Sequence, residues 1–218
     1  PSSPVSSSPP AARRVAARFV TIEHSPVFPP ERVGGHYAGI VPKLELWRYR
    51  TICRRWRNSL YPHRIIYVAD QNRQVYEQCY HYSRSKGIAI HNGVDTELFR
   101  PDSRARTVTR ASLGVSDGEF LFGLVGRLTA QKNQQLAIHA LSLLRKRGDR
   151  KRRIRLAIHG TGENEDDLRS LCAELDMDSC IIFAGHSSNA ATVYPAFDAL
   201  VMSSAWEGLP LTILESMA

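Results

Sequence analysis

The sequence lacks several features that would assign it at once to a particular class of protein. It has only four cysteines, and none stands in a C-x-x-C or other metal-ligand spacing, which favours reduced structural thiols over zinc or disulfides. No apolar run approaches the ~20 residues of a membrane-spanning helix, and no signal-peptide pattern opens the chain. These absences predict a globular protein that works inside the cell.

Acidic residues are scarce beside basic ones. The 21 Asp and Glu stand against 29 Lys and Arg, which gives a formal net charge of +8. This excess favours an anionic partner, and a nucleotide diphosphate, an acidic membrane surface and nucleic acid all meet that condition. Eight of the eleven residues in 145–155 are basic. We expect a solvated turn there, at the end of the sheet away from the ligand, although contact with nucleic acid or anionic lipid stays open.

The first third of the chain contains three segments that differ in composition. Residues 1–14 are rich in Pro and Ser, and we expect them to be disordered. The β-branched run 15–22 predicts a strand, with His24 at its carboxyl end. Residues 43–60 predict a basic amphipathic helix, which could pack on its own sheet or lie on an anionic membrane. The chain also lacks an initiator Met, so we expect a processed or truncated product.

The remainder alternates predicted strands and helices. The predicted strands are 64–68, 87–90, 120–125, 154–158, 180–183 and 199–202, and the predicted helices are 72–82, 133–145, 166–175 and 190–197. We expect the 133–145 helix to bury one face that carries Leu136, Ala137, Ala140, Leu141 and Leu144. Such alternation predicts an α/β fold with parallel sheets covered on both faces, as in Rossmann-like domains.

Two basic residues stand at the turn between the strand 120–125 and the helix that follows it. Arg127 and Lys132 are five residues apart. A lysine at the amino end of a helix opposes the helix dipole, so a bound anion explains its presence better than helix stability does. A guanidinium and an ammonium on either side of a diphosphate would neutralise a departing nucleotide.

Two glutamates bracket the last predicted helix, which we expect to begin near Pro210. Glu207 lies in the polar turn 203–209, and Glu215 lies about one and a half turns into the helix. Both can face the crevice at the carboxyl ends of the strands, where open parallel sheets bind ligands. An ordinary surface helix with a favourable acid near its start is the alternative interpretation.

The turn 203–209 and the helix start after it carry groups that are suited to binding a nucleotide sugar. The N–H groups of Gly208 and Leu209 at a helix start suit a phosphate. Carboxylates accept charge-assisted hydrogen bonds from the hydroxyls of a sugar or a ribose.

Three motifs resemble a known family. E-G-L-P-x4-E-x-M-A from Glu207 resembles the E-x7-E signature of retaining GT-B glycosyltransferases, most closely the family-four group. G-R-L-x3-K-N from Gly126 and N-G-V-D-x3-F-x-P from Asn92 match further motifs of that group, which also has a G-x-G-like loop, matched here at 160–162. Within the second of these motifs, the Asn92-Gly93 pair predicts a tight turn with a positive φ. The resemblance spans roughly residues 18–218.

The resemblance implies a fold and an activity. It implies two Rossmann-like domains of GT-B type: a partial acceptor-side domain over 15–103 and a truncated donor-binding domain over 104–218. It implies transfer of a sugar from a UDP- or GDP-linked donor to a glycan or lipid-linked acceptor, with retention of configuration, without a metal or other cofactor. The protein would be cytoplasmic, and peripheral contact with the inner face of the membrane stays open.

The resemblance also implies roles for individual residues. Glu207 would bind donor-sugar hydroxyls and Glu215 the ribose, while Arg127 and Lys132 meet the diphosphate. His24 would lie on the acceptor side. Gly126, Gly208 and Leu209 would complete the donor site.

Two other hypotheses remain. The chain could be a non-catalytic donor-binding remnant, because residues 15–91 supply only about three strands and the sequence stops inside the Glu215 helix. It should then bind donor and turn it over poorly. A basic nucleic-acid-binding protein is the third hypothesis, which the lack of an aromatic and basic recognition motif disfavours.

Overall fold

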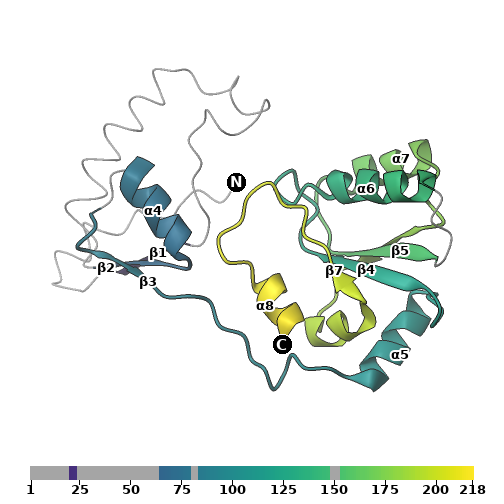
Figure 1. Ribbon diagram of the computed structural model, residues 1–218, viewed down its shortest axis with the longest axis horizontal. Helices are drawn as coiled ribbons and strands as arrows, with labels where there is room; N and C mark the ends of the chain where they lie inside the picture. Colours follow the sequence, from purple (N-terminus) through teal and green to yellow (C-terminus); the bar gives the residue numbers. More distant parts are fainter. Residues whose placement is uncertain (1–19, 24–63, 80–82, 148–152) are drawn as a thin grey trace. The chain divides into compact units, whose positions relative to one another are not determined.

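The computed structural model describes residues 20–23, 64–79, 83–147 and 153–218 (Figure 1). His24, the expected disordered segment 1–14 and the expected helix 43–60 lie outside the described residues. Contacts divide the chain into two units. The first extends to Asn92 and includes residues 207–209, and the second holds Gly93 to Trp206 and Pro210 to Ala218. The expected domain boundary near residue 103 lies ten residues after Gly93, where the second unit begins, and stays a prediction.

The first unit contains a small parallel sheet of order β1-β2-β3. Its strands are β1 (Val20–Glu23), β2 (Arg64–Tyr67) and β3 (Gly87–Ala89), and α4 (Asp70–Cys79) joins the last two. Ile65, Tyr67 and Tyr76 form its buried core. The predicted β-α-β succession is confirmed in this part of the chain.

The segment that leaves β3 corrects one expectation. Neither Asn92 nor Gly93 has a positive φ, because the chain does not reverse here. The side chain of Asn92 instead donates a hydrogen bond of 2.7 Å to the carbonyl of Leu209. The turn comes later, where Asp95 accepts hydrogen bonds from the N–H groups of Glu97 and Leu98.

The second unit contains a four-stranded parallel sheet of order β6-β5-β4-β7. Its strands are β4 (Phe120–Val125), β5 (Ile154–His159), β6 (Ile181–Gly185) and β7 (Ala199–Leu200). The central strands β4 and β5 pair over six residues each, from Phe120 beside Ile154 to Val125 beside His159. The expected parallel sheet is therefore present.

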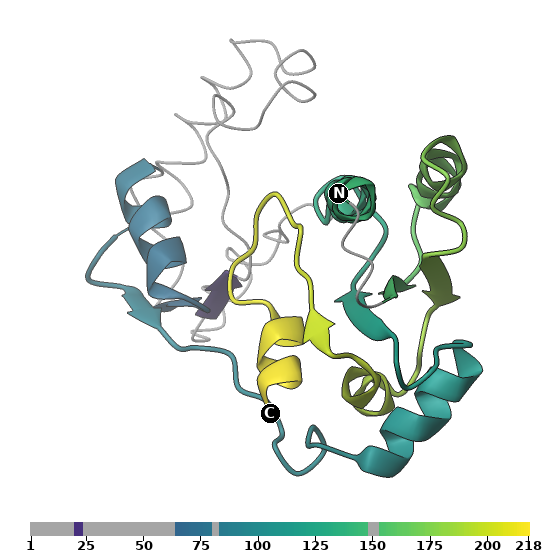
Figure 2. The same cartoon turned by 45° about the vertical axis from the view of Figure 1, so that its right-hand side comes forward.

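Helices cover both faces of this sheet (Figure 2). On one face α6 (Gln134–Lys146) and α7 (Glu165–Glu174) lie side by side and pack on Leu124, Leu156 and Ile158. On the other face are α5 (Ser103–Ser112), the short 3-10 helices η2 (Ala190–Thr192) and η3 (Tyr194–Ala196), and a small core around Leu121 and Ala157. The chain ends in α8 (Leu211–Met217), which Pro210 caps rather than begins.

The α5 helix was not predicted, because its arginines, serines and threonines show no apolar period. Asp102 caps it by accepting a hydrogen bond from the N–H of Ala105. Arg106 and the buried Arg110 then reach Asp198, at 2.6 and 3.2 Å, and bond to backbone carbonyls of the η3 segment. These two arginines therefore bind α5 to the segment that precedes β7.

The same network perturbs the carboxyl group of Asp198. Partial burial acts to raise its pKa, but the Leu121 N–H at 2.7 Å and the two guanidinium groups outweigh burial. The pKa of Asp198 is therefore held below its usual value.

The rotation of α6 differs from the prediction. The helix buries Gln134, Ala137, Ile138, Leu141 and Ser142, whereas the expected core residues Leu136, Ala140 and Leu144 are exposed. Two features set this rotation. The left-handed conformation of Asn133 precedes the helix, and the Gln134 side chain donates a 2.7 Å hydrogen bond to the carbonyl of Arg127.

Two other elements are shorter than expected. The predicted helix 190–197 is present as η2 and η3, because Pro195 lacks the N–H that a continuous helix needs. The strand predicted for 199–202 keeps only its first two residues. In the described part of the chain, no helix combines the length and the apolar character needed to cross a bilayer.

Candidate functional site

The candidate site lies at the edge of the second sheet where β4, β5 and β6 end. Because the strands are parallel, their carboxyl ends meet at this edge, and the loops that follow them lie together. The loop after β4 is fixed to the loop after β5 through its backbone. The N–H groups of Gly126 and Leu128 donate hydrogen bonds to the carbonyls of His159 and Thr161, at 2.9 and 3.0 Å.

Two glycines allow these loops to approach. A Cβ on Gly160 would lie 1.9 Å from the carbonyl oxygen of Gly126, and a Cβ on Gly162 would lie 2.3 Å from that of Leu128. Gly160 also has a φ of +143°, which L side chains rarely adopt. Any side chain at either position would separate the two loops, so the G-x-G pattern has a packing reason.

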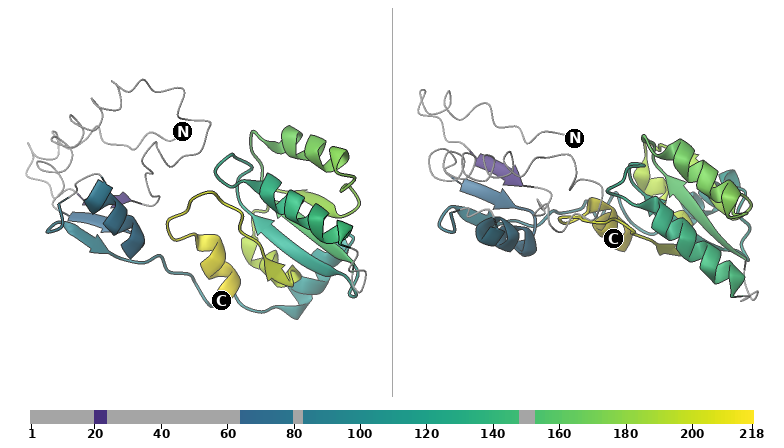
Figure 3. Two further views of the ribbon diagram at one scale, coloured as in Figure 1. Left: turned by 45° about the horizontal axis from the view of Figure 1, so that its top comes forward. Right: turned by 90° about the horizontal axis from the view of Figure 1, so that it is seen from above.

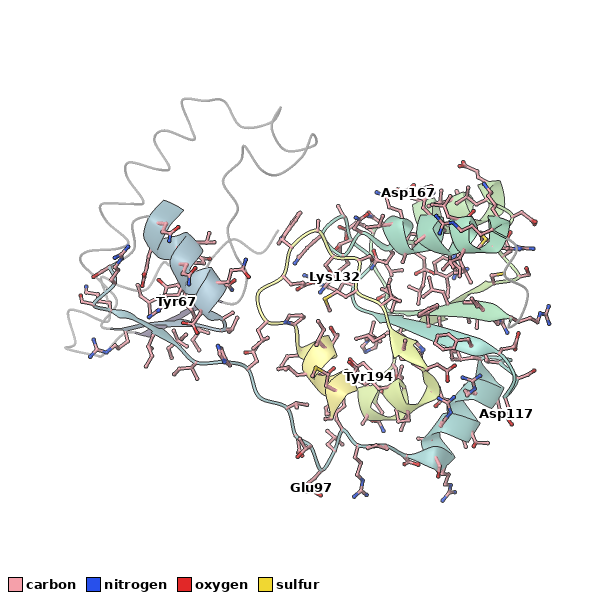
Figure 4. All side chains as sticks on the ribbon, in the orientation of Figure 1. Tyr67, Glu97, Asp117, Lys132, Asp167 and Tyr194 are labelled. Carbon is pink, nitrogen blue, oxygen red and sulfur yellow. The ribbon has the colours of Figure 1, made fainter. Side chains whose placement is uncertain are left out.

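Arg127 and Lys132 extend from the turn between β4 and α6. The guanidinium of Arg127 is exposed, and within the described ranges it makes no hydrogen bond or ion pair. The carbon stem of Lys132, labelled in Figure 4, passes over Gly126, with its Cε 3.5 Å from where a Cβ would stand. The structure therefore brings the two predicted cations onto one turn.

A pocket of about 270 Å³ opens beside this turn. The residues lining it come from the ends of the three strands and from η2 and its flank: Val125, Gly126, Arg127, His159, Gly160, Thr161, His186, Ser187, Ala190 and Val193. Arg127 is thus shared between the predicted cationic turn and a cavity at the carboxyl ends of the strands, where a ligand crevice was expected.

His159 is the buried polar group of this pocket. It is 7% exposed, and neither ring nitrogen has a hydrogen-bond partner among the described residues. Burial lowers its pKa, so the imidazole is neutral at pH 7. A neutral imidazole has one donor and one acceptor nitrogen, and in this structure both nitrogen atoms are buried. His159 was not predicted as a site residue, because a single histidine at the end of an apolar strand gives no pattern.

The loop that leads to Glu207 is tied to the loop of Lys132. Ser203 donates a 3.0 Å hydrogen bond to the carbonyl of Lys132. The N–H of Ala205 donates to the carbonyl of Gln131 at 2.8 Å, and the Gln131 amide donates to the carbonyl of Trp206 at 3.1 Å. Residues 203–206 are therefore joined directly to the loop of Lys132, which is about 70 residues earlier in the sequence.

The two predicted glutamates have different surroundings. Glu215 is half-buried in α8 and accepts a short hydrogen bond from the hydroxyl of Tyr194. Burial and this carboxylate raise the pKa of Tyr194. Tyr194, labelled in Figure 4, is a second residue that the sequence did not indicate. Glu207, Gly208 and Leu209 belong by their contacts to the first unit. Their expected meeting with Arg127 and Lys132 stays a prediction.

A larger pocket, of about 500 Å³, lies at the opposite edge of the sheet. Arg145, Arg153 and Arg155 line it together with Glu119 and apolar side chains such as Met177. The ends of the basic tract are therefore at the amino ends of β4 and β5, as expected, while residues 148–152 lie outside the described ranges. As for metals, no three His, Cys, Asp or Glu side chains of the described residues gather closely enough to hold an ion.

The sequence was compared with known families and curated proteins. The profile of the family described as Glycosyl transferases group 1 matches residues 105–218, just over half of the chain. An Escherichia coli UDP-Gal:alpha-D-GlcNAc-diphosphoundecaprenol alpha-1,3-galactosyltransferase is 27% identical over 156 residues, which are 71% of this chain and 40% of that protein. The alpha-monoglucosyldiacylglycerol synthase of Streptococcus pneumoniae is 30% identical over 59% of this chain and 30% of its own length. The chain therefore spans well under half of these relatives.

The fold was compared with solved structures. A structure of Anabaena HepE in complex with UDP-glucose superposes with a TM-score of 0.75 at 20% identity, over 95% of this chain and 52% of that one. The GT-B architecture that the sequence predicts is thereby confirmed for the part of the fold that this chain covers.

Proposed function

Because the chain belongs to the Glycosyl transferases group 1 family, we propose that it transfers a sugar from a nucleotide diphosphate donor to a hydroxyl acceptor. The observation that carries the proposal is the cationic turn after β4, which holds the exposed Arg127, a lining residue of the pocket, and Lys132, whose carbon stem passes over Gly126. Two cations on one turn match the two phosphates of a nucleoside diphosphate. HepE binds UDP-glucose and the E. coli relative is named for a UDP-linked donor, which favours UDP over GDP.

The pocket beside the turn is the proposed place of the nucleoside. Its volume of about 270 Å³ is of the size that a nucleobase with part of its ribose needs. His159 would donate or accept one hydrogen bond there, and its unpartnered nitrogens would otherwise remain buried at a cost. The N–H groups at the start of α6 would add to the phosphate contacts, because the side chain of Asn133 does not cap them.

The proposed reaction retains the configuration of the anomeric carbon, as in the family-four group. Glu207 would hold hydroxyls of the donor sugar, and Glu215 would hold the ribose. The acceptor oxygen would attack the anomeric carbon from the face that the diphosphate leaves. The bond from the anomeric carbon to the phosphate oxygen breaks, the new glycosidic bond forms, and the acceptor proton passes to the departing phosphate. Arg127 and Lys132 would stabilise the charge that develops on that phosphate.

We further propose that no metal or other cofactor takes part. Arg127, Lys132 and the helix ends would offset the diphosphate charge that a divalent ion offsets in other transferases. Turnover should therefore survive treatment with EDTA. A strict requirement for added Mn²⁺ or Mg²⁺ would contradict the proposal.

For the acceptor we propose only a chemical class and a location. One curated relative is named for a diphosphoundecaprenol-linked substrate and the other for a glucosyldiacylglycerol product, which supports a glycan or lipid-linked acceptor at the cytoplasmic face of a membrane. Residues 43–60 could contact that membrane, and His24 is the candidate acceptor-side residue. Both lie outside the described residues.

A titration separates this function from its rivals. Binding of UDP, GDP, uridine and RNA should be measured at low and high salt. A nucleotide-specific signal supports donor binding, whereas a steep salt dependence on RNA without nucleotide binding would indicate a nucleic-acid-binding protein.

Turnover of a panel of donors then tests catalysis. Free nucleotide should be measured for this chain and for a version extended at both ends. Turnover by the extended version alone would identify the present chain as a donor-binding remnant, and equal turnover would show that it is self-sufficient.

A further inference from the structure

The outward face of α6 carries an apolar stripe. Leu136 and Leu143 are 55% and 61% exposed, while Gln134 and Ser142 on the same helix are buried. At 100° per residue, the two leucines point directly away from the buried face, with the exposed Ala140 between them. The leucines are about 10 Å apart along the helix axis. A helix that buries polar groups and aligns leucines outward indicates a surface that another molecule covers.

Charged residues of opposite sign lie near the two ends of this stripe. The carboxyl end of α6 exposes Arg145, Lys146 and Arg147. The neighbouring α7 runs parallel to α6, because both helices connect strands of one parallel sheet (Figure 3). The first turn of α7 exposes Asp166 and Asp167, the latter labelled in Figure 4, near the amino end of α6. The carboxyl end of this surface is therefore basic, and the α7 side of its amino end is acidic, while Arg127 and Lys132 lie on the turn that precedes α6.

We propose that this surface binds the same surface of a second copy of this chain, with the two α6 helices antiparallel. A twofold axis between His139 and Ala140 places Leu136 against the partner's Leu143 and His139 beside the partner's Ala140. The antiparallel arrangement also brings Lys146 and Arg147 of each copy to the acidic first turn of the other copy's α7. Apolar contact at the centre and opposite charges at both ends make the surface self-complementary.

The charges favour a second copy over a lipid bilayer. Leucines beside arginines and lysines also suit a helix that lies on an anionic membrane. A membrane in contact with α6 would, however, approach Asp166 and Asp167 of the adjacent α7, and anionic headgroups would repel both carboxylates. A second copy brings the cations Lys146 and Arg147 to these carboxylates. The proposal does not depend on the glycosyltransferase assignment.

Sedimentation of the full chain tests the apolar contact. The wild type should show a concentration-dependent equilibrium between monomer and dimer, and a protein that stays monomeric over the whole accessible range would overturn the proposal. Leu143→Arg should weaken dimerisation at least about 100-fold, because it places a charge at the centre of the interface twice. Val108→Arg is the matched control, since Val108 is 62% exposed on α5, outside the proposed surface, and should dimerise as the wild type.

Charge reversal tests the antiparallel arrangement with variants that leave the leucines intact. Changing both Lys146 and Arg147 to Glu should weaken dimerisation, and changing both Asp166 and Asp167 to Lys should do the same. All four changes together should restore it. Failure of the combined variant to dimerise while circular dichroism shows it folded would overturn the proposed pairing. Co-sedimentation of a monomeric wild type with phosphatidylglycerol vesicles, lost in Leu143→Arg, would instead identify a membrane surface.

Discussion

Replacing Arg127 with alanine should separate ligand binding from stability. The guanidinium is exposed and without a partner in the described part of the chain, so the free energy of unfolding should change by less than about 0.5 kcal/mol. Charged hydrogen bonds to a diphosphate are worth roughly 1.5–3 kcal/mol. At about 1.4 kcal/mol per factor of ten, UDP should bind about 10- to 150-fold more weakly. Binding of uridine, which has no phosphate, should be almost unchanged.

The assay is calorimetric titration with UDP and with uridine at low and high salt, beside urea unfolding. Arg104→Ala is the matched control, because Arg104 is equally exposed on α5 and lies away from the proposed site. The control should bind both ligands as the wild type does, which excludes a general effect of net charge. An equal loss of UDP and uridine affinity in Arg127→Ala, or an equal loss of UDP affinity in the control, would refute the assignment of Arg127 to the phosphates.

Four further substitutions test other parts of the structure. Glu215→Gln should weaken binding of UDP itself, whereas Glu207→Gln should affect only the complete donor; titration of both ligands checks this, and equal UDP binding by both variants would contradict it. Asp198→Asn should destabilise the fold by about 1.5–3 kcal/mol at pH 7, because Arg110 stays buried without its counter-charge. The pKa of Asp198 is lower in the folded state than in the unfolded state, so the stabilisation by its carboxylate is complete above the unfolded pKa and is lost as pH falls through the folded pKa. Urea unfolding should therefore show the free energies of unfolding of the variant and the wild type converging in acid. The lowered pKa of His159 means that stability falls as pH drops below ~6.5, where the unfolded chain takes up the proton first; His159→Phe should reduce that fall, and an unchanged pH profile would refute it.

The sequence predicted those features that produce a pattern. The alternation of apolar runs indicated the parallel sheets, and the spacing of Arg127 and Lys132 indicated the cationic turn, which the structure contains. Helix α5 was not predicted, because its stability comes from Arg106 and Arg110, whose partner Asp198 is 92 and 88 residues away from them in the sequence. No local window contains both halves of that network.

Other errors arose from tertiary contacts that override periodicity. The apolar residues of α6 fit two helix faces about equally well, and the bond from Gln134 to the Arg127 carbonyl helps select the one that buries Gln134. Likewise, His159 and Tyr194 gain meaning only from what surrounds them: a pocket in one case and the Glu215 carboxylate in the other. A single residue in an apolar segment carries no such information.

The contact between the loops at Gly160 and Gly162 divides the proposed site into a part that mutation can hardly change and a part that it can change readily. The phosphate end of the proposed site is held by backbone atoms that meet at these glycines, so mutation can hardly adjust its shape without pushing the loops apart. The neighbouring side chains of His159, Thr161, His186 and Ser187 line the pocket without forming that joint. They can be exchanged while the frame keeps its geometry. Preference for one nucleotide over another could therefore drift by substitutions at these positions, and directed evolution of donor choice should begin there.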